Sequence, residues 1–393
     1  MSQDSVVIVS AARTPMGGMM GALSDVRAPD LCATAIKAAI ERAGIEGSDV
    51  DEVVMGCVLP AGLGQAPARQ ASRAAGIPDA AGATTINKMC GSGMKAVMLA
   101  HDQIMAGQVD VMVAGGMENM SQSPYILPKA RGGMRMGHGQ VIDHMFFDGL
   151  EDAYEGGLMG TYAQKSADDY AVTREAMDDF AISSLEKALK AIETGAFKDE
   201  ITPVTVKSRK GDVEVAIDEQ PGNARIDKIR QLKPAFKKDG TVTAANSSSI
   251  SDGGSALVLM KESEAKARGL QPLARIAAHS THAQLPAEFT IAPIGAIEKV
   301  LARAGWSKDD VDLYEINEAF AVVSMLAISE LGLDADKVNV NGGACALGHP
   351  IGSSGSRILV TLLYALKNAG KSKGVASLCI GGGEATAVAV EML

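Results

Sequence analysis

The sequence predicts an α/β fold that consists of two similar halves with a different segment inserted between them. Apolar runs typical of buried strands, such as Val6-Val7-Ile8-Val9, alternate with stretches of helical periodicity, and this alternation is typical of α/β proteins. The chain also resembles itself at a constant spacing of 261 residues. Its 393 residues agree with two or three domains at roughly 150 residues per domain.

Three matches in the same order indicate that a whole domain has been duplicated. Each pair is 261 residues apart: AIERAG ending at Gly44 with VLARAG ending at Gly305, SDVDEVVMG around Asp51 with DDVDLYEIN around Asp312, and CGSGMKAVMLA from Cys90 with IGSSGSRILVT from Ile351. A fourth match, VMVAGGME with SLCIGGGE, follows after a slip of five residues. Because the period spans a whole domain, the pattern predicts a pseudo-twofold pair of halves and not an array of short repeats.

Individual elements of the first half follow from their own patterns. Val53-Val54-Met55 and Val111-Met112-Val113 predict buried strands. The apolar positions from Leu31 to Ala43 recur at helical spacing and predict an amphipathic helix, which Gly44 ends.

The segment from about 121 to 248 has a different character. It contains a loop rich in Met and Gly (Gly132 to Gly137), a helical run from Ala167 to Ile192 and a short β-like piece from Ile201 to Val206. We expect an insertion that covers one face of the first half, and covering segments of this kind often carry substrate contacts. A purely structural excursion is the alternative.

Charge and cysteine content exclude several classes of partner. The net charge is −10, without a cluster of Lys or Arg, which argues against nucleic acid or an anionic membrane as a partner. No apolar run reaches the ~18 residues that a membrane span needs, and no secretory signal is visible at the N-terminus. Five cysteines without CxxC spacing predict free thiols and a cytoplasmic location.

Cys90 is the first candidate for chemistry. In INKMCGSGMKAVMLA a strand-like segment ends, two glycines permit a tight turn, and a helical run begins. This places the thiol near a helix N-terminus, where the dipole is expected to lower its pKa and favour thiolate. The glycines leave backbone N–H groups free for an oxyanion hole. The alternative is a small buried cysteine in a packed turn.

His349 is the second candidate. It lies in NGGACALGHPIGSSGSR, between Gly348 and Pro350, in the loop that the repeat equates with that of Cys90. A Cys–His pair is the common way to activate a thiol nucleophile. We interpret the five other histidines as structural: His101, His138, His144, His279 and His282. His279 and His282 suggest a metal site, but no Cys, Asp or Glu cluster accompanies them, so we expect none.

Two further motifs complete the constellation. In CIGGGEA a second thiol, Cys379, ends a predicted strand and is expected in the same crevice. The glycines there do not form a dinucleotide-binding loop, because no GxGxxG pattern follows. Asn317 in YEINEAFA lies in the loop that matches Gly56. Its amide is suited to donate a hydrogen bond into a central site, and a helix cap is the alternative.

Together these blocks resemble the four motifs of the thiolase family. The residues that carry the resemblance are Cys90 in NKMCGSG, Asn317 in NEAF, His349 in GGACALGHPIG and Cys379 in CIGGGEA, and it extends over the chain from AARTP at Ala11 to Pro15 onward. The resemblance implies thiolase-like duplicated halves that form a layered α-β-α-β-α core. The N-terminal half would be 1–120, completed by 249–272; the inserted loop domain would be 121–248, and the C-terminal half 273–393.

The resemblance also implies a two-step thioester exchange between acetyl-CoA or acetoacetyl-CoA and coenzyme A. Cys90 would take the acyl group, His349 would activate it, and Cys379 would be the acid and base. Asn317 would hold a water in an oxyanion hole that His349 completes, and the N–H groups of Cys90 and Gly381 would form a second hole. Claisen chemistry needs these functions, so no metal or other cofactor is expected. The family implies a homotetramer.

The inserted domain would then bind coenzyme A. The family contacts fall on Ser248 in TVTAANSSSISDG and on Leu150, Met159, Phe236 and Phe320, while Phe289 is expected near the acyl pocket. The chain departs from biosynthetic thiolases in two places: Leu158 stands where they have His, and DEQPGN (Asp218 to Asn223) lacks an Arg that many members have.

Four functions remain open. The leading one is an acyl-CoA C-acyltransferase that cleaves acetoacetyl-CoA or condenses two acetyl-CoA molecules. A 3-ketoacyl-CoA thiolase of β-oxidation with broader specificity is supported by Leu158 and Phe289. A ketoacyl-synthase-type condensing enzyme would have His or Asn in place of Cys379. A non-catalytic coenzyme A-binding scaffold predicts a broken motif, and every motif is intact.

Overall fold

The fold is organised around one large mixed sheet. The computed structural model describes residues 4–209 and 211–393. Along the sheet the strand order is β12-β13-β14-β11-β1-β10-β5-β3-β4, and β2 (Gly17–Gly18) pairs with β10. The first half supplies β1 (Val6–Arg13), β3 (Glu52–Gly56), β4 (Gly82–Ile86), β5 (Val111–Asn119) and β10 (Ser251–Lys261). The second half supplies β11 (Ala274–Ala283), β12 (Leu313–Ile316), β13 (Lys373–Ile380) and β14 (Glu384–Met392).

The strand pairing confirms the predicted duplication. In the first half β3 is parallel to β5, which is followed by antiparallel β10 and β1. In the second half β12 is parallel to β13, which is followed by antiparallel β14 and β11. Small details repeat as well: Asp51 accepts two backbone N–H bonds at the start of β5, and Asp312 does the same at the start of β13. The two halves meet where β1 pairs briefly with β11.

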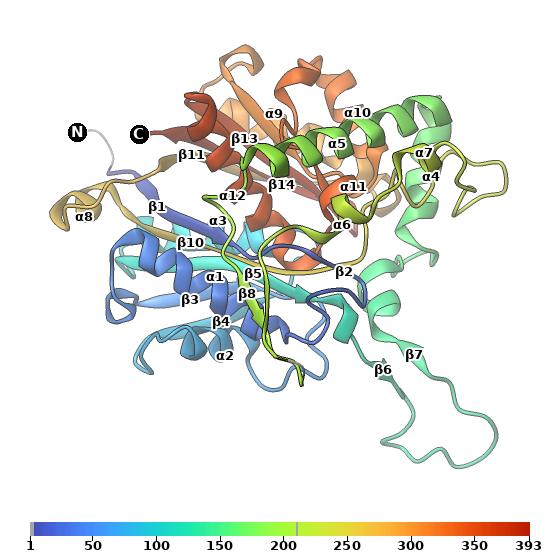
Figure 1. Cartoon of the computed structure of the whole chain (residues 1–393), viewed down its shortest axis with the longest axis horizontal. Coiled ribbons are helices and arrows are strands. Elements are labelled where there is room, and N and C mark those ends of the chain that lie inside the picture. The colour runs from blue at the N-terminus through green and yellow to red at the C-terminus, as the bar shows by residue number, and fades with distance from the viewer. Residues whose placement is uncertain (1–3, 210) are drawn as a thin grey trace.

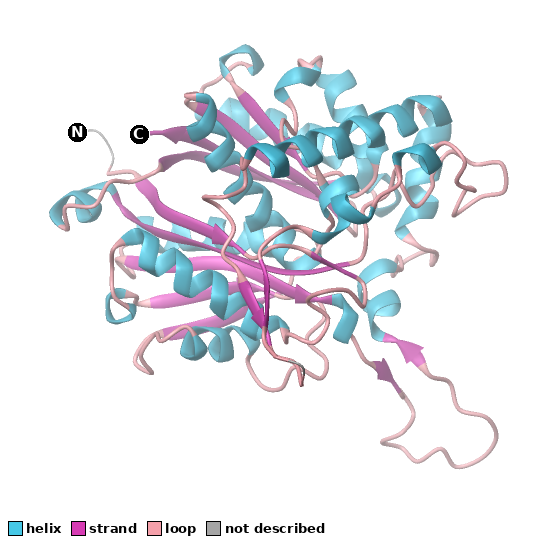
Figure 2. Ribbon diagram, in the orientation of Figure 1, coloured by secondary structure: helices cyan, strands magenta, loops and turns pink. Residues whose placement is uncertain are grey.

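Helices cover both faces of the sheet and also lie between its two parts (Figure 2). The first half has α1 (Ala28–Ala43), α2 (Pro67–Ala74) and α3 (Ser92–Met105), and α8 (Glu262–Ala267) follows β10. The second half has α9 (Ala292–Ala304), α10 (Ala321–Leu331), α11 (Ala344–Leu347) and α12 (Ile351–Ala369). The predicted helix before Gly44 is α1, and Gly44 caps it in the left-handed conformation.

Burial shows five layers. Successive side chains of a strand point to opposite faces, and accordingly Ile8 of β1 packs with α3 and α12 while Val7 packs with α1 and α2. The core around α3 and α12 also contains residues of β13 and β14. A third core joins the opposite face of β13 and β14 to α9 and α10. The order is therefore helix, sheet, helix, sheet, helix, as the fold class requires.

The insertion differs from its prediction in two respects. The expected single helical run is two helices, α4 (Met159–Asp169) and α5 (Arg174–Thr194). The break occurs because Ala171 has a positive φ of 51° and Thr173 caps α5 by accepting the N–H of Ala176. The insertion also contains β6 (Tyr125–Ile126), β7 (Ile142–Asp143), β8 (Val204–Val206), β9 (Val213–Val215), α6 (Glu219–Asn223) and α7 (Ile226–Ile229).

The insertion packs on the first half, as expected, and it also packs on the second half, which the sequence did not indicate. Helix α5 packs on α10 and α11 of the second half, and Ser184 on α5 donates a hydrogen bond to Glu318 at 2.7 Å. On the first half, Val204 of the β8–β9 hairpin contacts the cluster around Leu23, and Met145 packs with Val58 and Leu59. Figure 1 shows α5 over the upper, orange half and β8 across the lower, blue half. The insertion therefore spans both halves.

One hairpin of the insertion projects from the body of the molecule. Strands β6 and β7 begin and end a long loop that includes the predicted Gly132 to Gly137 stretch (Figure 1). Its apolar side chains are exposed, Met136 by 96%. Within the described residues, no helix has both the length and the apolar character that a membrane crossing would require.

Candidate active site

A cavity of about 560 Å³ lies where loops of the two halves and the insertion meet. Four residues predicted for chemistry line it: Cys90, His349, Cys379 and Gly381. Cys90 and His349 precede the N-termini of α3 and α12, and Cys379 lies near the end of β13, directly before the turn that holds Gly381. The structure thus brings together residues that are up to 291 positions apart (Cys90 and Gly381).

The turn that carries Cys90 is held by a serine. Met89 has a positive φ of 47°, and Gly91 caps α3. The side chain of Ser92 accepts the N–H of Lys88 at 2.8 Å and donates to the carbonyl of Met89 at 2.6 Å. The thiol is thereby fixed beside the first turn of α3.

The protonation of Cys90 differs from the prediction. Removal from water raises the pKa of its thiol to about 11, although hydrogen bonds from the N–H groups of Gly381 and of Cys90 itself oppose this shift. The prediction of a lowered pKa is therefore wrong, because desolvation exceeds the effect of the helix terminus. At neutral pH the resting residue is a thiol.

His349 is set up as a neutral base. Ser354 donates its hydroxyl proton to the carbonyl of Pro350 at 2.9 Å. The same oxygen lies 2.5 Å from Nδ1 of His349, and both bonds can form together only if Nδ1 donates to it. This assigns the proton to Nδ1 and leaves the lone pair on Nε2, which is buried and has no hydrogen-bond partner among the described residues.

Burial and the nearby charge of Arg357 lower the pKa of His349 to about 3. Arg357 is itself buried, and its Nη2 donates to Oδ1 of Asn317 at 3.4 Å. Because Oδ1 is the acceptor, Nδ2 of Asn317 is the free donor, and it has no partner within the described part of the chain. Asn317 lies beyond the end of β12 and is not on the wall of the cavity. Its predicted role as a water ligand stays a prediction.

Cys379 is almost completely buried at the end of β13, and the chain turns immediately after it. Burial raises the pKa of its thiol, and the proximity of Cys90 raises it further. The backbone N–H of Gly381 is directed at the sulfur of Cys90. The N–H groups of Cys90 and Gly381 therefore both lie close to the sulfur of Cys90.

All six residues predicted for substrate contacts line the same cavity, and Leu158 lines it too. They are Ser248, Leu150, Met159, Phe236, Phe320 and Phe289. The ring of Phe320 meets Phe236 and Phe289 edge to face, with centroids 6.2 and 6.3 Å away. The hydroxyl of Ser248 donates to the carbonyl of Ala319 at 3.0 Å, so its oxygen remains available to accept a hydrogen bond from a ligand.

A second cavity continues from the first, and sequence analysis missed it. Its volume is about 250 Å³, and it shares Gln220, Ala244, Ser247 and Ser249 with the first. Its wall also carries Arg225 and Lys228. The two basic residues could have suggested an anion site, but their sequence contains no phosphate-binding motif.

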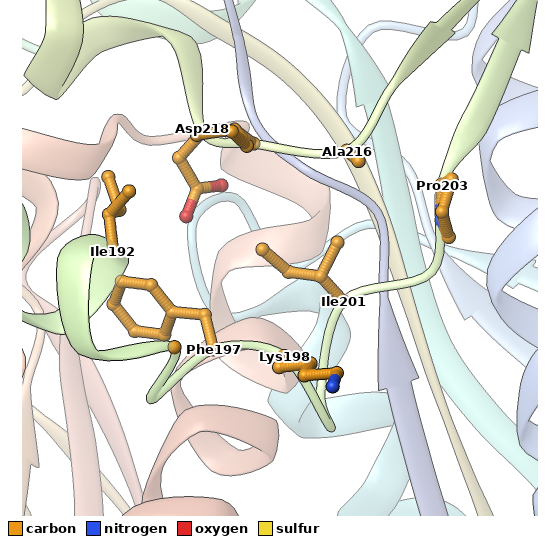
Figure 3. A pocket seen from close by; sticks show the side chains of 9 residues that line it. Ile192, Phe197, Lys198, Ile201, Pro203, Ala216 and Asp218 are labelled. Carbon is orange, nitrogen blue, oxygen red and sulfur yellow. The ribbon is translucent and has the colours of Figure 1, made fainter.

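A third cavity, of about 350 Å³, shares no lining residue with these two. Ile192, Phe197, Ile201 and Asp218 lie on its wall (Figure 3). Both carboxylate oxygens of Asp218 accept from the buried Arg13, at 2.7 and 2.9 Å. Because this carboxylate is already paired, the cavity offers mainly an apolar surface, and we assign no chemistry to it.

The interpretation of the remaining histidines requires a correction. His279 does have a carboxylate beside it: its Nε2 lies 2.9 Å from Oδ1 of Asp102 and 3.2 Å from Nδ1 of His101. His282 is not part of this group and contacts Gln284 instead. The cluster could not be seen in the sequence, because Asp102 and His279 are 177 positions apart.

Comparisons with known proteins agree with this geometry. The profile described as "Thiolase, N-terminal domain" matches residues 6–263, and "Thiolase, C-terminal domain" matches residues 270–392. The acetyl-CoA acetyltransferase of Cupriavidus necator is 52% identical over 388 residues, which are 98% of this chain and 99% of that protein. That of Escherichia coli (strain K12) is 52% identical over 389 residues, 98% and 99% of the two chains.

A solved structure supports the same assignment. The crystal structure of the Bacillus anthracis acetyl-CoA acetyltransferase superposes with a TM-score of 0.97 at 45% identity, and the match covers 100% of this chain and 99% of that one. With two family profiles that together cover nearly the whole sequence, and relatives of this similarity, the chain belongs to the thiolase family.

Proposed function

We propose that this chain is an acetyl-CoA C-acetyltransferase, which cleaves acetoacetyl-CoA with coenzyme A and condenses two acetyl-CoA molecules in the reverse direction. The observation that carries the proposal is the convergence of two thiols, one neutral imidazole and two backbone N–H groups on one cavity. These groups match the needs of a reaction that forms an acyl-enzyme and then breaks or makes a carbon–carbon bond.

In the cleavage direction Cys90 attacks the 3-keto carbon of acetoacetyl-CoA, and Nε2 of His349 takes the proton of the thiol. The neutral state of both groups fits this step, because the negative charge that develops on the substrate stabilises the imidazolium as it forms. The bond between C2 and C3 then breaks, and Cys379 gives its proton to C2 of the departing acetyl-CoA. An acetyl group remains on Cys90.

The second half of the reaction returns the protons. The Cys379 thiolate takes the proton of the coenzyme A thiol, and the coenzyme sulfur attacks the acetyl group on Cys90. His349 returns its proton to the sulfur of Cys90, which leaves as a thiol, and acetyl-CoA is released. The N–H groups of Cys90 and Gly381 stabilise the oxyanion of the acyl-enzyme, and Nδ2 of Asn317 orients a water at the other carbonyl.

The long cavity suits the acyl-pantetheine part of the substrate. Ser248 lies on its wall, together with the rings of Phe146, Phe236, Phe289 and Phe320. We expect the phosphates of coenzyme A to lie in the continuing cavity near Arg225 and Lys228, because cationic side chains attract phosphate. Both are more than half exposed and contact Asp227, so we expect each to affect the KM for coenzyme A modestly.

The test separates the two cysteines. Cys90→Ala should lose covalent labelling by radioactive acetyl-CoA, whereas Cys379→Ala should keep the labelling and lose acetoacetyl-CoA turnover. Cys32 is a buried residue of α1. Cys32→Ala is the matched control and should keep both the labelling and the turnover. Covalent labelling of Cys90→Ala, or normal turnover by Cys379→Ala, would contradict the roles.

The broader 3-ketoacyl-CoA thiolase is the alternative, and the names of the relatives do not favour it. A series of 3-ketoacyl-CoA substrates tests the preference: turnover should fall beyond four acyl carbons, and undiminished turnover at six or more would reverse the assignment.

Cofactor, assembly and location are further parts of the proposal. The two thiols and the imidazole supply each proton transfer, so the reaction should need no metal, and dialysis against EDTA should leave turnover unchanged.

We propose a cytoplasmic homotetramer in which the projecting β6–β7 loop, with its exposed apolar side chains, contacts another subunit. Light scattering of a variant with this loop shortened should then give a smaller assembly.

A further inference from the structure

A cluster of three potential metal ligands lies outside the proposed active site. His101 and Asp102 are neighbours on α3, and His279 is on β11 of the other half. Nδ1 of His101 is 3.1 Å from Oδ1 of Asp102, and Nε2 of His279 is 3.2 and 2.9 Å from the same two atoms. The two rings meet edge to face, with centroids 4.8 Å apart.

Hydrogen bonds can join at most two of the three edges of this triangle of atoms at one time. An ionised carboxylate only accepts hydrogen bonds, and each imidazole nitrogen either donates or accepts. If only one of the two facing nitrogens carries a proton, the other nitrogen directs a lone pair at Asp102. If both carry protons, two N–H groups face each other across 3.2 Å. Every protonation state therefore leaves one edge of the triangle without a hydrogen bond.

A cation at the centre satisfies all three edges at once. Tetrahedral zinc with bonds of about 2.0–2.2 Å to imidazole nitrogen and carboxylate oxygen separates neighbouring ligand atoms by about 3.3–3.5 Å. The observed separations of 2.9–3.2 Å need only a small expansion to reach this value. Two imidazoles and one carboxylate form a donor set that zinc accepts.

The surroundings allow a fourth ligand. Half of the Asp102 side chain is exposed, and the two rings are partly exposed, so an ion can enter and water can complete the coordination. We propose that His101, Asp102 and His279 bind a divalent transition-metal ion of the zinc class, with one position open to water.

Two features limit the affinity. Metal-bound imidazoles normally donate their second N–H to a partner, and Nδ1 of His279 is buried without one in the described structure. The positive charge of Lys95 also acts on His279. We therefore expect micromolar and not nanomolar binding.

The ion would connect the two halves of the molecule. Helix α3 belongs to the first half and begins two residues after Cys90, whereas β11 belongs to the second half. Binding at this point should stabilise the fold, and because the cluster does not line the cavity of Cys90, it should leave metal-free turnover unchanged. This inference is independent of the proposed function.

Cobalt(II) titration of the metal-free, full-length protein tests the site, since its visible spectrum reports the ligands. We expect one ion per chain in the wild type and in Cys90→Ala, without the thiolate charge-transfer band of cysteine binding. Asp102→Asn and His279→Ala should weaken binding at least tenfold. His282→Gln, which changes a histidine on the same strand, is the matched control and should bind like the wild type.

Thermal unfolding gives a second measurement. An ion at a hundredfold excess over its Kd should raise the wild-type Tm by about 2–4 °C, and it should not raise that of Asp102→Asn. The proposal is overturned if cobalt does not bind, if binding persists unchanged in His279→Ala and Asp102→Asn, or if it disappears in Cys90→Ala. Asp102→Asn keeps the shape of an exposed side chain, so a folding defect in His279→Ala does not affect the conclusion.

Discussion

Replacing Ser354 with alanine removes the hydroxyl that holds the ring of His349. In the wild type this oxygen accepts Nδ1–H and directs its own proton to the carbonyl of Pro350. In the variant Nδ1–H would be buried against a methyl group, so the ring either keeps an unsatisfied donor or moves its proton to Nε2. In the second case the nitrogen that faces the cavity can no longer accept the proton of Cys90.

The size of the effect follows from the cost of a buried, unsatisfied donor. That cost is about 1–3 kcal/mol, and one factor of ten in rate corresponds to about 1.4 kcal/mol. We therefore expect kcat for acetoacetyl-CoA cleavage to fall by about 5- to 150-fold. The KM should change little, because Ser354 is not on the cavity wall and touches no substrate group.

The assay is steady-state cleavage of acetoacetyl-CoA, together with the rate at which acetyl-CoA acylates the enzyme. Ser356→Ala is the matched control: Ser356 is buried in the same helix but bonds to Ser255 at 2.6 Å and does not contact His349. The control should lose less than threefold in kcat. A kcat of Ser354→Ala within twofold of the wild type, or an equal loss in both variants, would refute the argument.

Three further predictions concern the thiol, the cavity and a buried carboxyl group. Because burial raises the pKa of Cys90 to about 11, its alkylation by iodoacetamide should accelerate tenfold per pH unit from pH 7 to 10; a plateau below pH 8, measured by mass spectrometry, would contradict a neutral resting thiol. A Cβ on Gly160 would lie 2.1 Å from the ring of Phe236, so Gly160→Ala should push this ring into the cavity and raise the KM for acetoacetyl-CoA about tenfold. Gly222→Ala, where a Cβ meets nothing within 4 Å, should leave the KM unchanged. Burial raises the pKa of Glu118 to about 7, so the native state binds a proton that the unfolded state releases between about pH 4.5 and 7. The stability that this proton provides is present below this range and is lost as the pH rises through it. The free energy of unfolding of the wild type should therefore fall from pH 5 to 8, relative to that of Glu118→Gln, by at most about 3 kcal/mol. Urea denaturation measures this difference, and an identical pH dependence of the two proteins would exclude the assignment.

The two-half architecture could be predicted because duplication leaves a trace that needs no three-dimensional information. Gly44 and Gly305 both end a helix with positive φ, 70° and 69°, and this requirement keeps a glycine at equivalent places in both copies. The same register placed Cys90 and His349 on equivalent loops. Their convergence on one cavity follows from the pairing of the halves, while their chemical roles stay predictions.

Properties that depend on burial could not be predicted from local sequence. The helix terminus next to Cys90 is a local feature and favours thiolate, but the desolvation that outweighs it comes from segments far along the chain. The placement of the insertion depends in the same way on a distant contact, since Ser184 bonds to Glu318. By contrast, the break between α4 and α5 had a local signal in Thr173, a residue type that caps helices.

The duplication also accounts for a single active site in a molecule with two equivalent turns. The repeat partner of Cys90 is Ile351, which lines the same cavity as an apolar side chain. The second turn therefore has no nucleophile and instead presents His349 two residues earlier. Helix α12 can approach the first half this closely because glycine occupies the contacts: a Cβ on Gly116 of β5 would lie 2.0 Å from the carbonyl oxygen of Gly352, and one on Gly93 of α3 would lie 2.9 Å from the backbone nitrogen of Ser356. A side chain at either position would separate α12 from the first half, and with it the imidazole from the thiol. The glycines at these contacts are thus needed to keep the proposed base close to the proposed nucleophile.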